Sequence, residues 1–198
     1  MKNIINCITN DNPFINKKLK EVSVEEGLVI AEELFQILNK RGDGIGLAAN
    51  QVGIDAQVAV VNVTEPLVLI NPKYIKKEVE IVYGEGCLSF PGHAIKTKRY
   101  RDVIIQTAQS ESGWYFSGVD GDDQEKRLLE AVCVQHEMDH LMGKTMHDRE
   151  VKLEPTKVEK KIGRNQKVLI ACGSDSKVVK YKKAIPLLEN GWTLVESE

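Results

Sequence analysis

Hydrophobic residues recur with a helical period near the start of the chain. Five of them follow one another at steps of three or four residues, which puts them on one face of a helix: Val24, Leu28, Ala31, Phe35 and Leu38. The four residues that begin at Ser23, Ser-Val-Glu-Glu, form a capping box, and Gly42 is a typical stop. We therefore predict a helix over 23–42 that serves as scaffold.

Four segments after this helix are rich in β-branched residues and are separated by proline or glycine. They span residues 57–63, 67–70, 73–82 and 103–108. Such segments are typical of strands. Because few helices separate them, we expect a mainly antiparallel or mixed sheet.

A second helix, predicted over 124–142, has apolar residues on nearly every side. They are Leu128, Leu129, Ala131, Val132, Val134, Met138, Leu141 and Met142. A helix of this kind is buried nearly all round. Its polar residues His136, Glu137 and His140 need a reason to be there, because burying an unpaired polar group costs about 1–3 kcal/mol.

Composition indicates one main domain with a small terminal module. The chain has 198 residues, 42% apolar and 28% charged, and becomes lysine-rich after Arg149, with Pro155 opposing a continuous helix. We predict an α+β fold with a mixed, mainly antiparallel sheet around the second helix. Residues 1–155 form the main domain in this prediction, and residues 156–198 form a small lysine-rich extension in which 168–171 and 177–180 fit a β-hairpin.

Charge and cysteine content narrow the class of protein further. The net charge of −2 gives no field that would attract DNA, but residues 151–198 carry ten Lys or Arg against six Asp or Glu. This tail suits an anionic partner, and a solvated lysine-rich surface is the alternative. With four scattered cysteines, no apolar signal core and no apolar run of about 20 residues, we expect a cytoplasmic protein without a membrane span.

The spacing of His136 and His140 puts both imidazoles on one face of the second helix. Glu137 then lies beside the open position of a metal that both rings hold, which is the HExxH arrangement. Catalytic metal sites usually have a third protein ligand. Cys87, which follows a strand and a glycine, is the best candidate, whereas Cys133 lies within an apolar run that favours core packing.

The segment 42–51 is too rich in glycine for a regular element and too apolar for a solvated loop. Its backbone must approach another group closely, and Gly44 and Gly46 would let it approach a peptide. A tightly packed turn in which Gln51 only caps backbone is the alternative.

Three segments together resemble the signature motifs of the peptide deformylase family. They are 44–51 (GIGLAANQ), 85–89 (EGCLS) and 135–140 (QHEMDH), in the family's order, and the likeness covers roughly residues 10–150. The resemblance implies a metal-dependent hydrolase of protein biosynthesis that removes the formyl group from the N-terminal formylmethionine of nascent polypeptides and releases formate. Its partners would be N-formylmethionyl peptides.

The resemblance also implies roles for individual residues. The metal ligands would be Cys87, His136 and His140. Glu137 would be general base and acid, while the side-chain amide of Gln51 and the backbone N–H of Leu88 would donate to the oxyanion.

Other residues match positions around the reacting group in the family. The methionine side chain would lie against Ile45, Gly46, Leu129, Val132 and Cys133, for which a plain core role is the alternative. Glu85 and Arg99 resemble an ion pair that braces the ligand loop.

The ligand set does not fix the metal. A thiolate with two imidazoles suits zinc, iron, nickel or cobalt. The resemblance implies one Fe²⁺ per chain in the native protein, for which Zn²⁺, Ni²⁺ or Co²⁺ can substitute.

Two rival functions remain open from the sequence. An HExxH metallopeptidase would need a downstream His or Glu in place of Cys87, and His147 lies too close along the chain for that role. A catalytically silent relative that binds peptides or the ribosome would not need Glu137 and Gln51. The long basic C-terminal helix of many relatives is not evident, so we expect any ribosome contact to be made by the basic tail.

Overall fold

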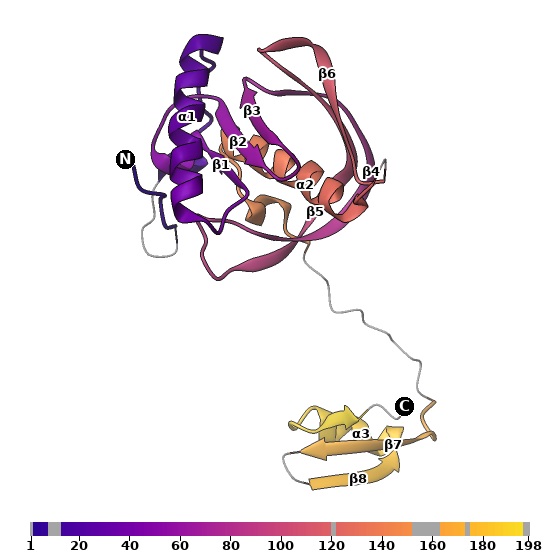
Figure 1. Ribbon diagram of the computed structural model, residues 1–198. Coiled ribbons are helices and arrows are strands. Elements are labelled where there is room, and N and C mark those ends of the chain that lie inside the picture. Colours follow the sequence, from indigo (N-terminus) through magenta and orange to yellow (C-terminus); the bar gives the residue numbers. More distant parts are fainter. Residues whose placement is uncertain (1, 8–12, 120–121, 152–162, 173–174, 196–198) are drawn as a thin grey trace. The chain divides into compact units, whose positions relative to one another are not determined.

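The computed structural model describes residues 2–7, 13–119, 122–151, 163–172 and 175–195 (Figure 1). The chain divides into two compact units, Met1–Lys152 and Leu153–Glu198. The domain boundary expected at residue 155 lies outside the described residues.

The first long helix, α1 (Val24–Arg41), follows a short 3-10 helix, η1 (Pro13–Asn16). The Ser23 hydroxyl accepts a hydrogen bond from the Glu26 N–H and caps its start. At its end Gly42 has a φ of 77°, a conformation that favours glycine, and its N–H donates to the Leu38 carbonyl. The predicted helix and both of its ends are confirmed.

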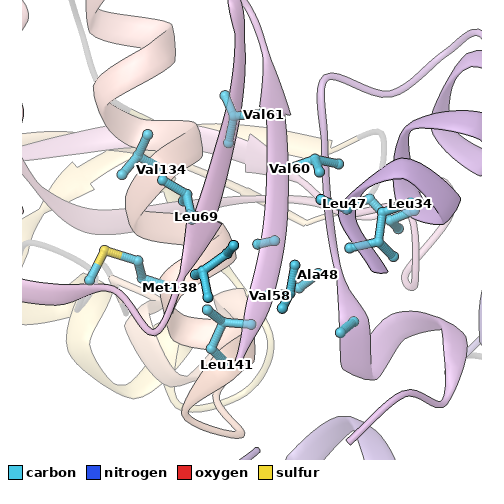
Figure 2. Packing of buried hydrophobic residues seen from close by; sticks show 14 of the residues in the cluster. Leu34, Leu47, Ala48, Val58, Val60, Val61, Leu69, Val134, Met138 and Leu141 are labelled. Carbon is cyan, nitrogen blue, oxygen red and sulfur yellow. The ribbon is translucent and has the colours of Figure 1, made fainter. Parts of the chain in front are cut away.

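The first sheet has the strand order β1-β2-β3, with β1 (Gly46–Ala48), β2 (Val58–Asn62) and β3 (Pro66–Ile70). It lies in the main core, where Leu34 and Leu47 pack near one side of β2 and Val134 and Met138 near the other (Figure 2). A 3-10 helix, η2 (Ala49–Val52), follows β1 directly and carries Gln51. The core therefore fixes the position of the glycine-rich motif.

The second sheet has the order β4-β5-β6, with β4 (Lys73–Gly86), β5 (Ala94–Thr107) and β6 (Ser110–Ser117). The strands β4 and β5 form a long hairpin in which Gly86 pairs with Ala94. Cys87 is thus the first residue of the loop that joins them. The sequence predicted only parts of β4 and β5 and did not predict β1 or β6.

The central helix, α2 (Gln124–Leu141), packs against both sheets (Figure 1). Every residue from Glu130 to Leu141 is buried, as the apolar pattern predicted. Its beginning is exposed, and Met142 is the C-cap and 47% exposed because the chain turns away there. A 3-10 helix, η3 (Met146–Arg149), ends the first unit.

The expected α+β fold around a central helix is confirmed. The sequence analysis expected one mixed, mainly antiparallel sheet. All strand pairs described in the first unit are antiparallel, but they form two separate sheets. Within the described part of the chain, no helix has the length and apolar character needed to cross a membrane.

The described residues of the second unit form a small sheet with one helix. Its strand order is β8-β7-β9, with β7 (Lys167–Cys172), β8 (Asp175–Lys180) and β9 (Thr193–Val195), and α3 (Tyr181–Leu188) packs on it. The strands β7 and β8 occupy the segments expected to form a hairpin. The helix and the third strand were not predicted.

Candidate metal centre

Three potential metal ligands converge between α2 and the β4–β5 loop. Cys87, His136 and His140 offer one donor atom each, and these atoms all lie within 4.8 Å of one another. The Cys87 Sγ atom is 3.3 Å from His140 Nε2. Because α2 places two of the three side chains and the long hairpin places the third, two distant parts of the sequence build this cluster.

The donor set fits a single metal ion. Zinc bond lengths of about 2.3 Å to sulfur and 2.0–2.1 Å to nitrogen put the two atoms about 3.6 Å apart around a tetrahedral ion, close to the separation of Cys87 and His140. Among the buried side-chain atoms of the described residues, Glu137 Oε2 and His140 Nδ1 have no hydrogen-bond partner. The His140 nitrogen beside Cys87 is Nε2, not Nδ1, so the fit to a metal rests on the three converging donor atoms and their spacing.

A buried carboxylate fixes the orientation of His136. The His136 Nδ1 atom lies 2.7 Å from Glu85 Oε2, which leaves Nε2 for a metal. Burial alone would raise the pKa of Glu85, but hydrogen bonds from His136 and Arg99 outweigh it and lower the pKa to about 2. Glu85 is therefore ionised and accepts the hydrogen bond that orients the ring.

Arg99 connects Glu85 to α2. Its Nε and Nη2 atoms donate to the two Glu85 oxygens, and its Nη1 atom donates to Asp139 Oδ2 at 2.5 Å. All three side chains are buried. The expected pairing of Glu85 with Arg99 is present, and the structure adds Asp139, which the sequence analysis left without a role although it lies next to His140.

Glu137 is buried and close to the glycine-rich segment. A Cβ atom on Gly46 would overlap Glu137 Oε1 and would lie 2.7 Å from Cys133 Sγ. Gly46 is therefore required for close packing against the glutamate, in addition to the expected approach to a peptide. Burial raises the pKa of Glu137 to about 7, which suits a group that both takes and returns a proton near neutral pH.

The side chain of Gln51 has a fixed orientation. Its Oε1 atom accepts from the Ala48 N–H at 2.8 Å, so its NH₂ group points to Ser89 Oγ at 3.2 Å and Cys87 Sγ at 3.6 Å. The N-terminal segment ties the two loops together, because the Ile5 N–H donates to the Gln51 carbonyl and the Cys7 N–H to the Ser89 carbonyl. The amide donor thus faces the cluster.

A cavity of about 530 Å³ opens beside these groups. Most of the residues singled out from the sequence line it: Ile45, Gly46, Gln51, Glu85, Cys87, Leu88, Leu129, Val132, Cys133, His136 and Glu137. His140 and Arg99 lie deeper and do not line it. The cavity places Glu137, Gln51 and the apolar residues of α2 around one space.

Sequence reasoning missed several residues of this cavity. Tyr83 and Phe90 line it, as do Arg41 and His93. Tyr83 could have been found, because it lies two residues before Glu85 and strand alternation puts both on one face. Phe90 and His93 lie in the irregular loop after Cys87, and Arg41 is the last residue of α1, so none of these three gives such a signal.

Replacing Arg99 with Ala should weaken metal retention by about 10–100-fold, a typical loss when groups that orient ligands are changed. The substitution leaves the buried carboxylates of Glu85 and Asp139 without their shared cation, so the support of His136 loosens. The measurement is metal content after dialysis, with the exposed neighbour Lys98→Ala as control. Unchanged metal content in Arg99→Ala would contradict this role.

Comparison with known families gives one consistent result. The model of the family described as polypeptide deformylase matches residues 4–156. The peptide deformylase of Pseudoalteromonas translucida is 42% identical over 143 residues, which is 70% of this chain and 81% of that relative. That of Hamiltonella defensa is 36% identical over 143 residues, 70% of this chain and 79% of the relative.

Solved structures agree with the sequence relatives. The peptide deformylase of Thermotoga maritima has a TM-score of 0.62 and 29% identity, and the match covers 76% of this chain and 98% of that one. A peptide deformylase of Synechococcus elongatus in complex with actinonin has a TM-score of 0.63 and 31% identity, covering 77% and 80% of the two chains.

Proposed function

Because the chain belongs to the peptide deformylase family, whose function is the deformylation of nascent peptides, we propose that it works through a metal held by Cys87, His136 and His140. The observation that carries this assignment is the convergence of the three donor atoms within 4.8 Å of one another. As a member of this family the protein is a metal-dependent hydrolase.

The reaction hydrolyses the amide bond between the formyl group and the N-terminal nitrogen, and its products are formate and a free amine. A divalent ion at these ligands would supply Lewis acidity, which lowers the pKa of water from 15.7 towards about 7. The Glu137 carboxylate takes a proton from the water that adds to the formyl carbon. It then delivers this proton to the amine nitrogen as the carbon–nitrogen bond breaks.

Two donors stabilise the negative charge on the formyl oxygen in this proposal. The Gln51 NH₂ group points towards Cys87 and is neutral, so it adds no charge beside the metal ligands. Leu88 lines the same cavity, and its backbone N–H is the second donor in this proposal. Removing one donor of this kind costs about 2.7–4 kcal/mol in other enzymes.

The methionine side chain of the substrate would occupy the apolar part of the cavity. Leu129, Val132 and Cys133 line it from α2, and Ile45 lines it from the opposite segment. The Cys133 thiol lies 3.8 Å from the Ile45 carbonyl oxygen, which supports a narrow pocket formed by both elements.

We infer from the resemblance to the family that the native metal is Fe²⁺. Zn²⁺, Ni²⁺ or Co²⁺ can substitute, because a thiolate with two imidazoles suits all four metals. Anaerobic preparation followed by metal analysis tests this assignment. One iron per chain, lost on exposure to air together with activity, is the expected result. Full activity of an iron-free zinc protein would contradict it.

We further propose that the protein acts in the cytoplasm on chains emerging from the ribosome and that the second unit contacts ribosomal RNA. The described residues of this unit carry six exposed cations, Arg164, Lys167, Lys177, Lys180, Lys182 and Lys183, against two anions, Asp175 and Glu189. Clustered cations on a small module favour binding to phosphate groups.

Reversing the charge of Lys180, Lys182 and Lys183 to Glu should weaken ribosome binding and reduce its salt dependence. The slope of log K against log salt concentration should become less steep by about 0.9 for each phosphate that these lysines no longer neutralise. Binding to purified ribosomes at several salt concentrations measures both. A variant with Lys40, Lys98 and Lys126 changed to Glu, all exposed in the first unit, is the control. Equal weakening in the two variants would rule out a specific interaction of the second unit.

A further inference from the structure

A bidentate ion pair joins η3 to the helix that carries two of the proposed ligands. The Arg149 Nε and Nη2 atoms donate to Asp139 Oδ2 and Oδ1 at 2.9 and 2.7 Å. Asp139 is buried and precedes His140 in α2. Its carboxylate is thus held by two guanidinium groups, those of Arg149 and Arg99.

Arg99 and Arg149 together neutralise two buried carboxylates, those of Glu85 and Asp139. Arg99 donates to Asp139 through Nη1 and to Glu85 through Nε and Nη2. Without Arg149, Asp139 Oδ1 would lose its partner while Arg99 still binds Oδ2, and an incompletely paired buried carboxylate is costly. A shift of Arg99 towards Asp139 would reduce this cost, so Glu85 would lose part of its own partner.

A partial loss of the Arg99 hydrogen bonds to Glu85 would affect the metal centre. Glu85 is the group that holds His136 Nδ1, at 2.7 Å. A chain of direct contacts therefore runs from Arg149 through Asp139 and Arg99 to Glu85 and the His136 ring.

The segment around Arg149 is itself fixed to the elements of the site. Thr97 on β5 forms a β-bridge with Glu150, and the Val151 N–H donates to the Lys96 carbonyl at 2.8 Å. The His147 ring packs edge-on against Phe90 of the Cys87 loop, with ring centroids 4.9 Å apart. Arg149 therefore reaches Asp139 from a segment held by both the sheet and the ligand loop.

We infer that Arg149 is a positioning residue of the metal centre, which saturates Asp139 so that Arg99 remains bound to Glu85 and Glu85 keeps His136 in its ligating orientation. This inference rests on the proposed metal site. Arg149 touches neither the metal nor the substrate and acts only through the contacts named.

The variants Arg149→Ala and Arg149→Lys test this role, with Arg101→Ala as a matched control. The Arg101 and Arg149 side chains are both 34% exposed, and each lies 2.7 Å from an aspartate that is 6% exposed, but Arg101 pairs with Asp102 away from the metal cluster. Lysine keeps the charge of Arg149 and loses the two-pronged hydrogen bond. Comparing Arg149→Lys with Arg149→Ala separates the effect of hydrogen-bond geometry from that of charge. Comparing Arg149→Ala with Arg101→Ala separates both from a change of general stability.

The experiment uses full-length protein loaded with Co²⁺ and follows release of the metal to a chelator, the visible spectrum of the bound ion, and kcat and KM for a formyl-Met peptide. Arg149→Ala should release Co²⁺ about 10–100-fold faster with an altered spectrum and a lower kcat at similar KM, and Arg149→Lys should fall between it and the wild type. Arg101→Ala should behave as the wild type.

Release and spectrum like the wild type in Arg149→Ala would overturn the inference, and so would equal changes in Arg149→Ala and Arg101→Ala. If Arg149→Ala does not fold, the comparison of Arg149→Lys with Arg101→Ala decides in the same way. A wild-type protein that binds no metal would contradict the proposed function as well, whereas a wild type that binds metal beside unaffected variants contradicts the positioning role alone.

Discussion

Replacing Glu137 with Gln is expected to lower kcat for formate release by about 10²–10⁴-fold while one metal per chain is retained. Gln has the size of Glu and fits beside Gly46, but it cannot take a proton from water or return one to the amine. Because Glu137 is not among the proposed ligands, the metal should stay. The measurements are formate release from a formyl-Met peptide and metal content of the same sample.

Glu130→Gln is the matched control for this prediction. Glu130 is also a buried glutamate of α2, but it accepts hydrogen bonds from Thr64 and does not line the cavity. Its replacement should change stability and leave kcat close to that of the wild type. Equal formate release by Glu137→Gln and the wild type would contradict the assigned proton transfer.

Replacing Cys87 with Ala should release the metal and reduce formate production to background. The substitution removes one of three donor atoms and the only thiolate among them, so the loss of affinity should exceed the about 10–100-fold that changes around ligands usually cause. Without the metal, water keeps its ordinary pKa and does not attack the amide. Metal analysis after gel filtration and a formate assay measure the two effects.

Cys172→Ala serves as the control, because this thiol is exposed and belongs to the second unit. Thermal unfolding of both variants distinguishes metal loss from general unfolding. A Cys87→Ala protein that keeps one metal and the wild-type rate would exclude the thiolate as a ligand and would favour a peptidase-like site.

The sequence predicted most where the determining contacts are local. The helix that carries His136 and His140 follows from residues within two turns of one another, and its burial follows from the apolar residues around it. The caps Ser23 and Gly42 fix α1 in the same local way. These elements could be predicted because each depends on few distant contacts.

The first half of β5 could not be predicted from its apolar pattern. Its inward-facing residues include Thr97 and Arg99, which are fully or almost fully buried and polar. They face inward because they bind Glu85, a residue 12 to 14 positions away, and no alternation of apolar residues reveals that interaction. When the buried face of a strand consists of polar residues that bind other site residues, its sequence lacks apolar alternation and cannot be distinguished from that of a solvated loop.

The surroundings of Asp139 and Gly46 were also beyond the sequence. Asp139 is part of the recognised motif, yet its partners Arg99 and Arg149 come from β5 and η3. The close approach of Gly46 to Glu137 and Cys133 depends on how β1 packs on α2. Tertiary packing alone determines these features.

The most direct test of the central claim is to analyse the products formed from a formyl-Met peptide by anaerobically prepared, metal-loaded protein, with an acetylated peptide of the same sequence as control. We predict formate and an equal amount of otherwise intact peptide with a free amino terminus, and no reaction with the acetylated peptide. Fragments cut within the peptide, or no formate from protein shown to hold its metal, would contradict the assignment.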